Sequence, residues 1–248
     1  MRTRLDAHLV AIRAFASRAR AQSAIAAGLV RVDGVVARKP SLLIAESSAI
    51  SVDGDVHDFV SRGGVKLTAA LDAFAIDPSG LICLDLGAST GGFSDVLLRR
   101  GAAKVYAADV GRGQLHERIA ADPRVVSLEK THARDLSCAL IPEPVDLIVC
   151  DVSFISLKKA LPPALTLANR GARLVALVKP QFEVGASRLR KGGLVDASDA
   201  EAAARDIRDW MARRSGWRLI GLIESPIQGG DGNREFLLGA TRDETRDA

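Results

Sequence analysis

The chain has 248 residues, 48% of them hydrophobic, which is enough for one large domain or for a large and a small one. No apolar run approaches the ~20 residues of a membrane span, and the N-terminal segment lacks the apolar core of a signal peptide. The three cysteines lack CxxC spacing and the four histidines form no ligand pattern, so the sequence predicts reduced thiols and no metal site. We therefore expect a cytoplasmic protein without membrane attachment.

Positive charge is concentrated near the N-terminus. Residues 1–40 carry eight basic and two acidic side chains, a net charge of +6, whereas the rest of the chain has a net charge of −2. A basic lobe beside a nearly neutral body is typical of proteins that bind a polyanion. A solvated basic surface accounts for the same charge, so charge alone leaves both interpretations open.

The first 58 residues have the pattern of a small α+β module. Apolar spacing predicts a helix from Leu5 to Ile12, and Ser17 is placed to cap a second helix that stops at Gly28. Asp33-Gly34 between alternating residues predicts a hairpin, and residues 49–52 predict a last strand. Aromatic residues are sparse here, which favours recognition of RNA shape and phosphates over base stacking.

This segment resembles the S4 RNA-binding module. The resemblance rests on Arg4-Leu-Asp6, Ala16-Ser17-Arg18, Gly28-Leu-Val30 and Val32-Asp33-Gly34, with Asp-Gly where that family usually has Asn-Gly. It implies a class of ligand rather than a reaction. The candidate RNA-binding side chains are basic and lie in this module or just after it: Arg4, Arg18, Arg20, Arg31 and Arg62.

A glycine-rich turn follows the next hydrophobic strand. Residues 81–85 read as a buried strand that ends in the acidic residue Asp85, and the glycine-rich turn with Gly87, Ser89, Gly91 and Gly92 then leads into a helix near Phe93. The spacing differs from the G-x-G-x-x-G of dinucleotide-binding proteins, and Asp85 would repel a phosphate. An acidic strand end favours a ligand with ammonium and sulfonium groups, which indicates S-adenosylmethionine. The next strand ends in Asp109, where a carboxylate is placed to accept ribose hydroxyls.

Strands and helices alternate through the rest of the chain. Residues 124–129, 145–151 and 173–179 predict further strands, a helix follows around residues 200–214, and the last two strands form a hairpin. The fold class is therefore α/β, a Rossmann-like doubly wound sheet preceded by the small α+β module. We predict an RNA-binding domain at 1–58, a linker at 59–66 and a catalytic domain at 67–248.

Charged residues end several strands on one predicted edge of the sheet. Asp151 and Lys179 close adjacent strands, and Glu235 lies near the start of the last, antiparallel strand. A lysine at the end of an apolar strand needs carboxylate partners if it is buried. These charges form either a structural ion-pair cluster or a catalytic site, and their position beside a nucleoside pocket favours catalysis.

The linked motifs resemble the TlyA family, S4-fused FtsJ-like ribosomal RNA methyltransferases that are also labelled haemolysins. The resemblance covers residues 2–241 and rests on Ser61-Arg-Gly-Gly-Val-Lys66, Asp85 to Phe93, Cys150-Asp151-Val-Ser-Phe and Leu177-Val-Lys179-Pro-Gln-Phe-Glu183. It implies 2′-O-methylation of ribosomal RNA, on cytidines of 16S or 23S rRNA, by a Lys66-Asp151-Lys179-Glu235 tetrad. His132 stands where the family often has Asn in the adenine-side loop.

The cofactor contacts expected for S-adenosylmethionine come from the glycine turn and the two acidic strand ends: Asp85, Gly87, Ser89, Gly91, Gly92, Phe93, Asp109 and Asp151. A ribose 2′-hydroxyl is a weak acid, so Lys179 either stabilises its alkoxide or accepts its proton, with Asp151 and Glu235 orienting Lys179. Lys66 would stabilise charge on the oxygen or on the adjacent phosphate.

Three functional classes compete at this point. They are an rRNA methyltransferase, a non-catalytic protein that binds RNA or ribosomes, and a haemolysin-like cytolysin. The complete tetrad argues against the second, and the absence of a membrane-inserting stretch in the sequence argues against the third. The expected partner is ribosomal RNA or a ribosomal subunit; the sequence does not define the oligomeric state, and a monomer is the working expectation.

Overall fold

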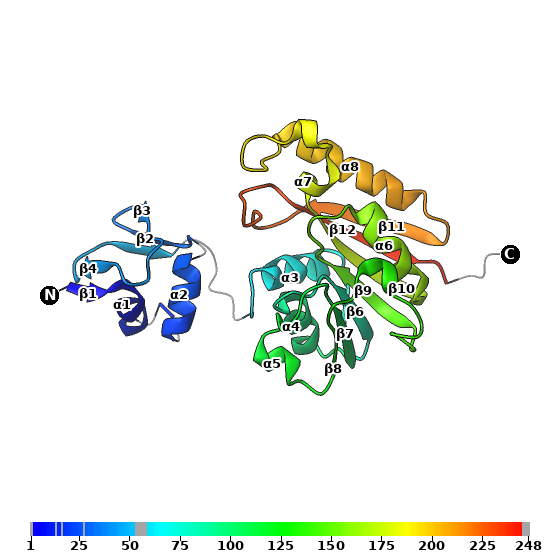
Figure 1. The fold of residues 1–248 in the computed structure, drawn as a ribbon, viewed down its shortest axis with the longest axis horizontal. Coiled ribbons are helices and arrows are strands. Elements are labelled where there is room, and N and C mark those ends of the chain that lie inside the picture. The colour runs from blue at the N-terminus through cyan, green and yellow to red at the C-terminus, as the bar shows by residue number, and fades with distance from the viewer. Residues whose placement is uncertain (1, 13, 16, 27, 53–58, 245–248) are drawn as a thin grey trace. The chain divides into compact units, whose positions relative to one another are not determined.

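The computed structural model describes residues 2–12, 14–15, 17–26, 28–52 and 59–244. The chain divides into two compact units, residues 1–58 and 59–248, which are described separately (Figure 1). Residues 59–66, predicted as a linker, fall in the second unit, and helix α3 (Gly63–Ala73) begins among them. The predicted domain boundaries stay a prediction. Ala16, residues 53–58 and the side chain of Arg20 lie outside the described residues.

The first unit packs two helices against short strands. Helices α1 (Leu5–Ala11) and α2 (Arg18–Ala26) accompany a sheet of order β3-β2-β5, made of Val35–Val36, Val30–Val32 and Ile50–Val52. The predicted Asp-Gly hairpin is confirmed, with positive φ at both turn residues (51° at Asp33 and 81° at Gly34). A second strand pair, β1 (Arg2–Arg4) with β4 (Leu43–Ala45), was not predicted. The core of this unit is made of buried apolar side chains from the helices and the strands, among them Leu5, Leu9, Phe15, Ala21, Ile25, Val30 and Ile44.

The second unit is built on a seven-stranded sheet of order β11-β12-β10-β9-β6-β7-β8. The strand bounds are β6 Ile82–Leu86, β7 Lys104–Ala108, β8 Val125–Leu128, β9 Val145–Cys150, β10 Ala168–Val178, β11 Trp217–Glu224 and β12 Phe236–Arg242. Strands β6 to β10 pair in parallel, and β12 runs antiparallel to both β10 and β11. The predicted doubly wound sheet with a terminal hairpin is therefore confirmed.

Helices cover both faces of this sheet. One buried cluster joins the sheet to α3, α4 (Gly92–Arg99) and α5 (Glu117–Ala120), and a second joins it to α6 (Leu157–Thr166) and α8 (Ala197–Ala212). Alternate residues of β6 divide between the two faces, Cys83 in the first cluster and Leu84 in the second. Short turns complete the unit: α7 (Pro180–Glu183), η1 (Ala133–Asp135) and η2 (Ala186–Arg188).

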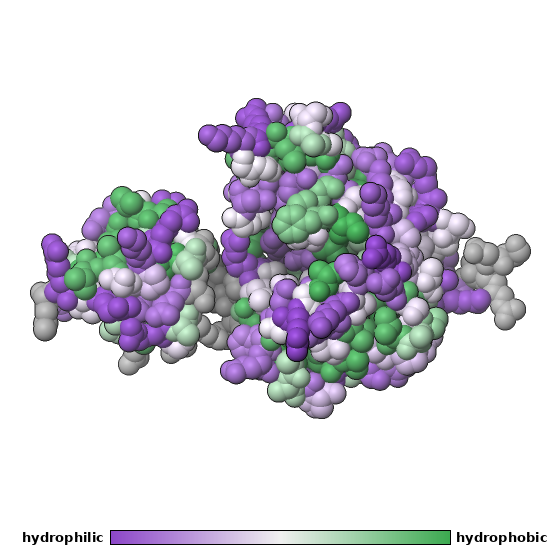
Figure 2. Space-filling model, viewed as in Figure 1, coloured by the Kyte–Doolittle hydropathy of each residue, from purple (hydrophilic) through white to green (hydrophobic). Residues whose placement is uncertain are grey.

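The surface is mainly polar. Figure 2 shows hydrophilic side chains over much of the visible face of each unit, with hydrophobic residues between them in smaller patches. Within the described ranges, no helix is both long enough and apolar enough to traverse a bilayer.

Strand register determines where the functional side chains meet. Leu86, the last residue of β6, pairs with Ala108 on one side and Cys150 on the other, and Cys150 in turn pairs with Ala176 of β10. Four parallel strands thus end close to one another at a single edge. Because ligands of open α/β sheets bind outside the carboxyl ends of the strands, the loops after these strands form the expected site.

Candidate active site

The glycine turn after β6 passes very close to the loop after β9. Gly87 has a φ of 85°, and a β-carbon built there would lie 2.6 Å from the carbonyl oxygen of Asp151. Gly91 caps α4 with a φ of 90°, and Ser89 also has positive φ (47°). Only glycine fits the first of these positions without displacing backbone, so the turn and Asp151 are held against each other.

Asp109 holds the same turn from the second strand end. Its Oδ2 accepts the backbone N–H of Ser89 at 2.9 Å, and its Oδ1 accepts that of Gly111 at 2.7 Å. Each carboxylate oxygen has two lone pairs, so both retain an acceptor site for a ligand hydroxyl. Asp109, Ser89 and Gln114 line a small pocket beside the turn, together with Glu129, which follows β8.

Asp85 lies behind the turn rather than on the surface of a cavity. Its side chain is fully buried, and Oδ2 accepts both the backbone N–H (2.9 Å) and the hydroxyl (2.6 Å) of Ser94 in the first turn of α4. Burial raises its pKa to about 7 against the opposing hydrogen bonds. The sequence predicts that Asp85 contacts the ligand directly. In the structure its carboxyl is buried and accepts hydrogen bonds from donors at the start of α4.

The four tetrad residues form two ion pairs at this edge. Lys179, which caps α7, lies 2.5 Å from Asp151 Oδ1 and donates a hydrogen bond to Ser153 Oγ at 2.9 Å. Lys66, in the second turn of α3, donates to Oε2 of Glu235, and both of these side chains are almost fully buried. The Lys179–Asp151 pair is more exposed, at 13% and 24%.

The two pairs influence each other electrostatically. The pKa of Glu235 is raised by burial, opposed by Lys66 and Lys179 and reinforced by Asp151. The four residues come from separate segments of the chain and form these two pairs at one edge of the sheet, and their catalytic role stays a prediction.

A cavity of about 280 Å³ joins the glycine turn to the ion pairs. Its walls include residues predicted for cofactor binding, catalysis and RNA binding: Gly87, Ser89, Gly92, Phe93, Lys66, Asp151, Lys179 and Arg62. Ser61, Thr90 and Ser153 also line it and were not predicted. Two other predicted residues do not line this cavity: Glu235 is paired with Lys66, and Gly91 is the N-cap of α4.

Three residues that contact or border the glycine turn were not among the predicted site residues: Ser61, Gln114 and Glu129. Ser61 Oγ would collide with a β-carbon at Gly92, so residues of the predicted linker pack onto the glycine turn. Gln114 receives a hydrogen bond from Ser89 Oγ at 3.2 Å. The available signals were the position of Glu129 at the end of a predicted strand and the place of Ser61 in the motif that ends at Lys66, whereas nothing in the sequence marked Gln114.

Two of the predicted RNA-binding arginines of the first unit, Arg4 and Arg18, pair with a buried carboxylate. Asp6 Oδ1 accepts Arg4 Nε at 3.0 Å, and Asp6 Oδ2 accepts Arg18 Nη2 at 2.9 Å and Gln22 Nε2 at 2.8 Å. These hydrogen bonds hold the pKa of Asp6 well below its usual range. The two arginine side chains remain about half exposed, and Arg31 donates to the carbonyl of Gly34.

Comparison with solved structures defines the class of fold. An O-methyltransferase from Bacillus cereus in complex with SAH superposes with a TM-score of 0.52 over 76% of this chain and 84% of that chain, at 17% identity. A protein from Streptococcus thermophilus that carries the name hemolysin superposes with a TM-score of 0.76 over 98% of this chain and 90% of that one, at 37% identity. The second unit therefore has a methyltransferase fold.

Sequence comparison defines the family. Residues 59–242 match the FtsJ-like methyltransferase family, and residues 3–50 match the S4 domain. The 16S/23S rRNA (cytidine-2′-O)-methyltransferase TlyA of Mycobacterium tuberculosis is 48% identical over 96% of this chain and 89% of its own length. Hemolysin A of Brachyspira hyodysenteriae is 39% identical over 89% of this chain and 92% of its own length. The chain belongs to the FtsJ-like methyltransferases that carry an N-terminal S4 domain.

Burial of Asp85 predicts a specific pH dependence of stability. In the unfolded chain this carboxyl ionises near pH 4, whereas in the folded chain it stays protonated until about pH 7. The folded state then holds more protons across that window, so the free energy of unfolding falls as pH rises, by at most about 1.4 kcal/mol per pH unit. Asp85→Asn removes this contribution and should show a flatter profile between about pH 4 and pH 7.

Chemical denaturation at a series of pH values, followed by tryptophan fluorescence, measures the difference. Asp77→Asn, an exposed carboxyl before the same strand, is the matched control. Parallel profiles for wild type and Asp85→Asn would contradict the assignment.

Proposed function

We propose that this protein uses S-adenosylmethionine to methylate the ribose 2′-hydroxyl of cytidines in ribosomal RNA. It would act as a monomer in the cytoplasm. The observation that carries the proposal is the single cavity in which the glycine turn meets the Lys179–Asp151 pair. The names of the M. tuberculosis relatives support the substrate class.

The residues present fit the cofactor. Gly87 lines the cavity with backbone alone, because a side chain there would collide with the backbone of Asp151, and Asp109 retains acceptor sites beside the turn. Ser89 and Asp109 would hold the nucleoside end, and the turn from Gly87 to Gly92 would hold the other end. Asp85 would act indirectly by fixing the start of α4. When bound, the cofactor supplies an electrophilic methyl group on a sulfonium.

The chain's own residues prepare the nucleophile. Lys179 would contact the 2′-hydroxyl and either accept its proton or stabilise the oxygen as its proton leaves. Asp151 and Ser153 fix the position of Lys179 Nζ, and Lys66 would place a second positive charge on the cavity wall. Positioning inside a confined cavity then provides much of the rate, and the reaction needs no covalent enzyme intermediate.

Two other functions fit less of the site. A non-catalytic RNA-binding protein has no use for two partly buried lysine–carboxylate pairs beside a cofactor cavity. A cytolysin is named for some relatives, and that name gives no role to the glycine turn or to the tetrad. The methyltransferase uses all of these features.

The cofactor assignment predicts the effect of Asp109→Ala. Loss of charge-assisted hydrogen bonds to the cofactor ribose should weaken S-adenosylmethionine binding by about 1–3 kcal/mol in calorimetry. Because Asp109 also holds Ser89 and Gly111, Asp109→Asn serves as the companion variant that keeps one acceptor oxygen. Affinity equal to wild type in both variants would remove Asp109 from the site.

The catalytic assignment predicts that Lys179→Ala loses nearly all methyl transfer while it retains the fold and both ligands. Lys179→Arg distinguishes the two roles, because a guanidinium keeps the charge but does not act as a base near neutral pH. Single-turnover rates on a responsive rRNA substrate are the measurement, and Lys159→Ala, an exposed lysine on α6, is the control. An active Arg variant would limit Lys179 to an electrostatic role, and an Ala variant with wild-type rate would rule out both.

The first unit should provide phosphate contacts through its arginines. Arg18→Ala should reduce the slope of log affinity against log salt by about 0.7–0.9, the contribution of one phosphate contact. Gln22→Ala removes a neutral partner of the same Asp6 oxygen and should leave that slope unchanged, which separates a phosphate contact from a structural role. RNA binding measured over a range of salt concentrations would contradict the prediction if both variants gave the wild-type slope.

A further inference from the structure

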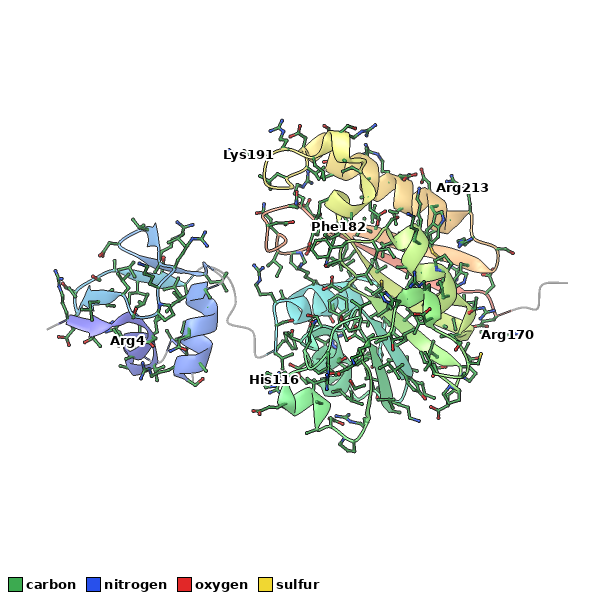
Figure 3. All side chains as sticks on the ribbon, in the orientation of Figure 1. Arg4, His116, Arg170, Phe182, Lys191 and Arg213 are labelled. Carbon is green, nitrogen blue, oxygen red and sulfur yellow. The ribbon has the colours of Figure 1, made fainter. Side chains whose placement is uncertain are left out.

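A second cavity of this unit lies away from the proposed active site. It has a volume of about 420 Å³ and is lined where α6 and α8 end and where β12 finishes. Ala168 at the start of β10 pairs with Val145 at the start of β9, so this is the edge at which the parallel strands begin. The active site lies at the opposite edge, where they end. Figure 3 labels Arg170 on this side of the unit.

Three arginines from separate segments line the cavity. Arg170 follows the first residues of β10, Arg214 follows α8, and Arg242 ends β12. The only carboxylate among the lining residues is that of Asp243, so the charged side chains of the wall sum to +2. Like charges brought together on a cavity wall repel one another, and an anion between them removes that repulsion.

Most of the guanidinium donors have no protein acceptor. Among the described residues, the Arg242 guanidinium donates to the carbonyl of Ala168, and neither Arg170 nor Arg214 donates a side-chain hydrogen bond. The Nε of Arg214 is buried without an acceptor. Its guanidinium lies over the ring of Trp210, 4.7 Å from the ring centroid. The ring face attracts the positive charge of the guanidinium but does not accept hydrogen bonds from its in-plane N–H groups.

Apolar side chains form the rest of the wall. Leu165 and Trp217 are largely buried and face the cavity beside the arginines. A wall with apolar groups and converging guanidiniums is typical of sites that hold a small organic ligand by its anionic group. A volume of about 420 Å³ falls in the range of such sites.

We propose that this cavity is a binding site for a phosphate group, separate from the methyl-transfer site. Guanidiniums bind phosphate in a bidentate way, and a phosphate monoester with two negative charges would neutralise the +2 wall. The phosphate is carried either by a small phosphorylated sugar or nucleotide or by the backbone of the RNA. In either case Arg170, Arg214 and Arg242 contact its oxygens, and the organic part contacts Trp217 and Leu165.

The chain contains a built-in probe for this site. It has two tryptophans; Trp217 lines the cavity and Trp210 lies under Arg214. Tryptophan emission therefore reports on the cavity and not on the glycine turn. Titration with ribose 5-phosphate, at constant ionic strength set with sodium chloride, should give a saturable change in emission, and ribose should give none.

Variants test which residues cause the change. Arg170→Gln and Arg242→Gln leave the contact between Arg214 and Trp210 intact, and each should weaken ribose 5-phosphate binding about tenfold through the lost charge-assisted bonds. Arg213→Gln, an exposed neighbour that does not line the cavity, should bind as wild type. Thermal unfolding of each variant verifies that the fold is retained.

A second titration identifies the source of the phosphate. A short RNA without terminal phosphate that displaces ribose 5-phosphate would assign the site to the RNA backbone, and failure to displace it would assign the site to a small ligand. The proposal is overturned if neither ligand changes tryptophan emission saturably. It is also overturned if Arg170→Gln and Arg242→Gln both keep wild-type affinity for ribose 5-phosphate. None of these outcomes depends on methyl transfer.

Discussion

The close approach of Gly87 to the backbone of Asp151 is the contact on which the site depends. It is reinforced by a hydrogen bond from the N–H of Asp151 to the carbonyl of Leu86, so the pairing of β6 with β9 continues to the edge of the sheet. The proposed cofactor turn and the carboxylate that positions Lys179 are therefore fixed by one piece of backbone. A shift in either strand would move both, which makes the spacing between cofactor and nucleophile a property of the sheet rather than of flexible side chains.

Electrostatics divides the tetrad into two pairs with different surroundings. Lys66 and Glu235 are almost completely buried, and a charge left alone there would carry a large desolvation penalty. Lys179 and Asp151 are more exposed and border the cavity. This difference favours Lys179 as the group that meets the 2′-hydroxyl, with the deeper pair setting the electrostatic surroundings. The positive charge of Lys179 opposes the rise in the pKa of Glu235, which links the two pairs electrostatically.

Local patterns allowed much of the fold and the site to be predicted. Asp33-Gly34 determined a hairpin because both residues tolerate positive φ, and the glycine turn and charged strand ends located one edge of the sheet. The tetrad needed more than periodicity, because its members are far apart in sequence and came together through the family resemblance. What the sequence did not reveal depended on three-dimensional packing: the β1–β4 pair joins short strands with little pattern, and the Asp85 carboxyl is buried against the start of α4. Packing of Ser61 onto Gly92 is likewise invisible in the sequence.

The ion pair between Lys66 and Glu235 joins residues 169 positions apart. Because Glu235 immediately precedes β12, which lies between β10 and β11 in the sheet, the pair forms only after the chain has been synthesised as far as β12. Until then Lys66 lacks its carboxylate, and the sheet lacks an inner strand. Long-range closure of this kind is slow compared with local helix formation. A chain synthesised only as far as β11 therefore holds an unfinished tetrad, and the site is completed when β12 inserts between β10 and β11.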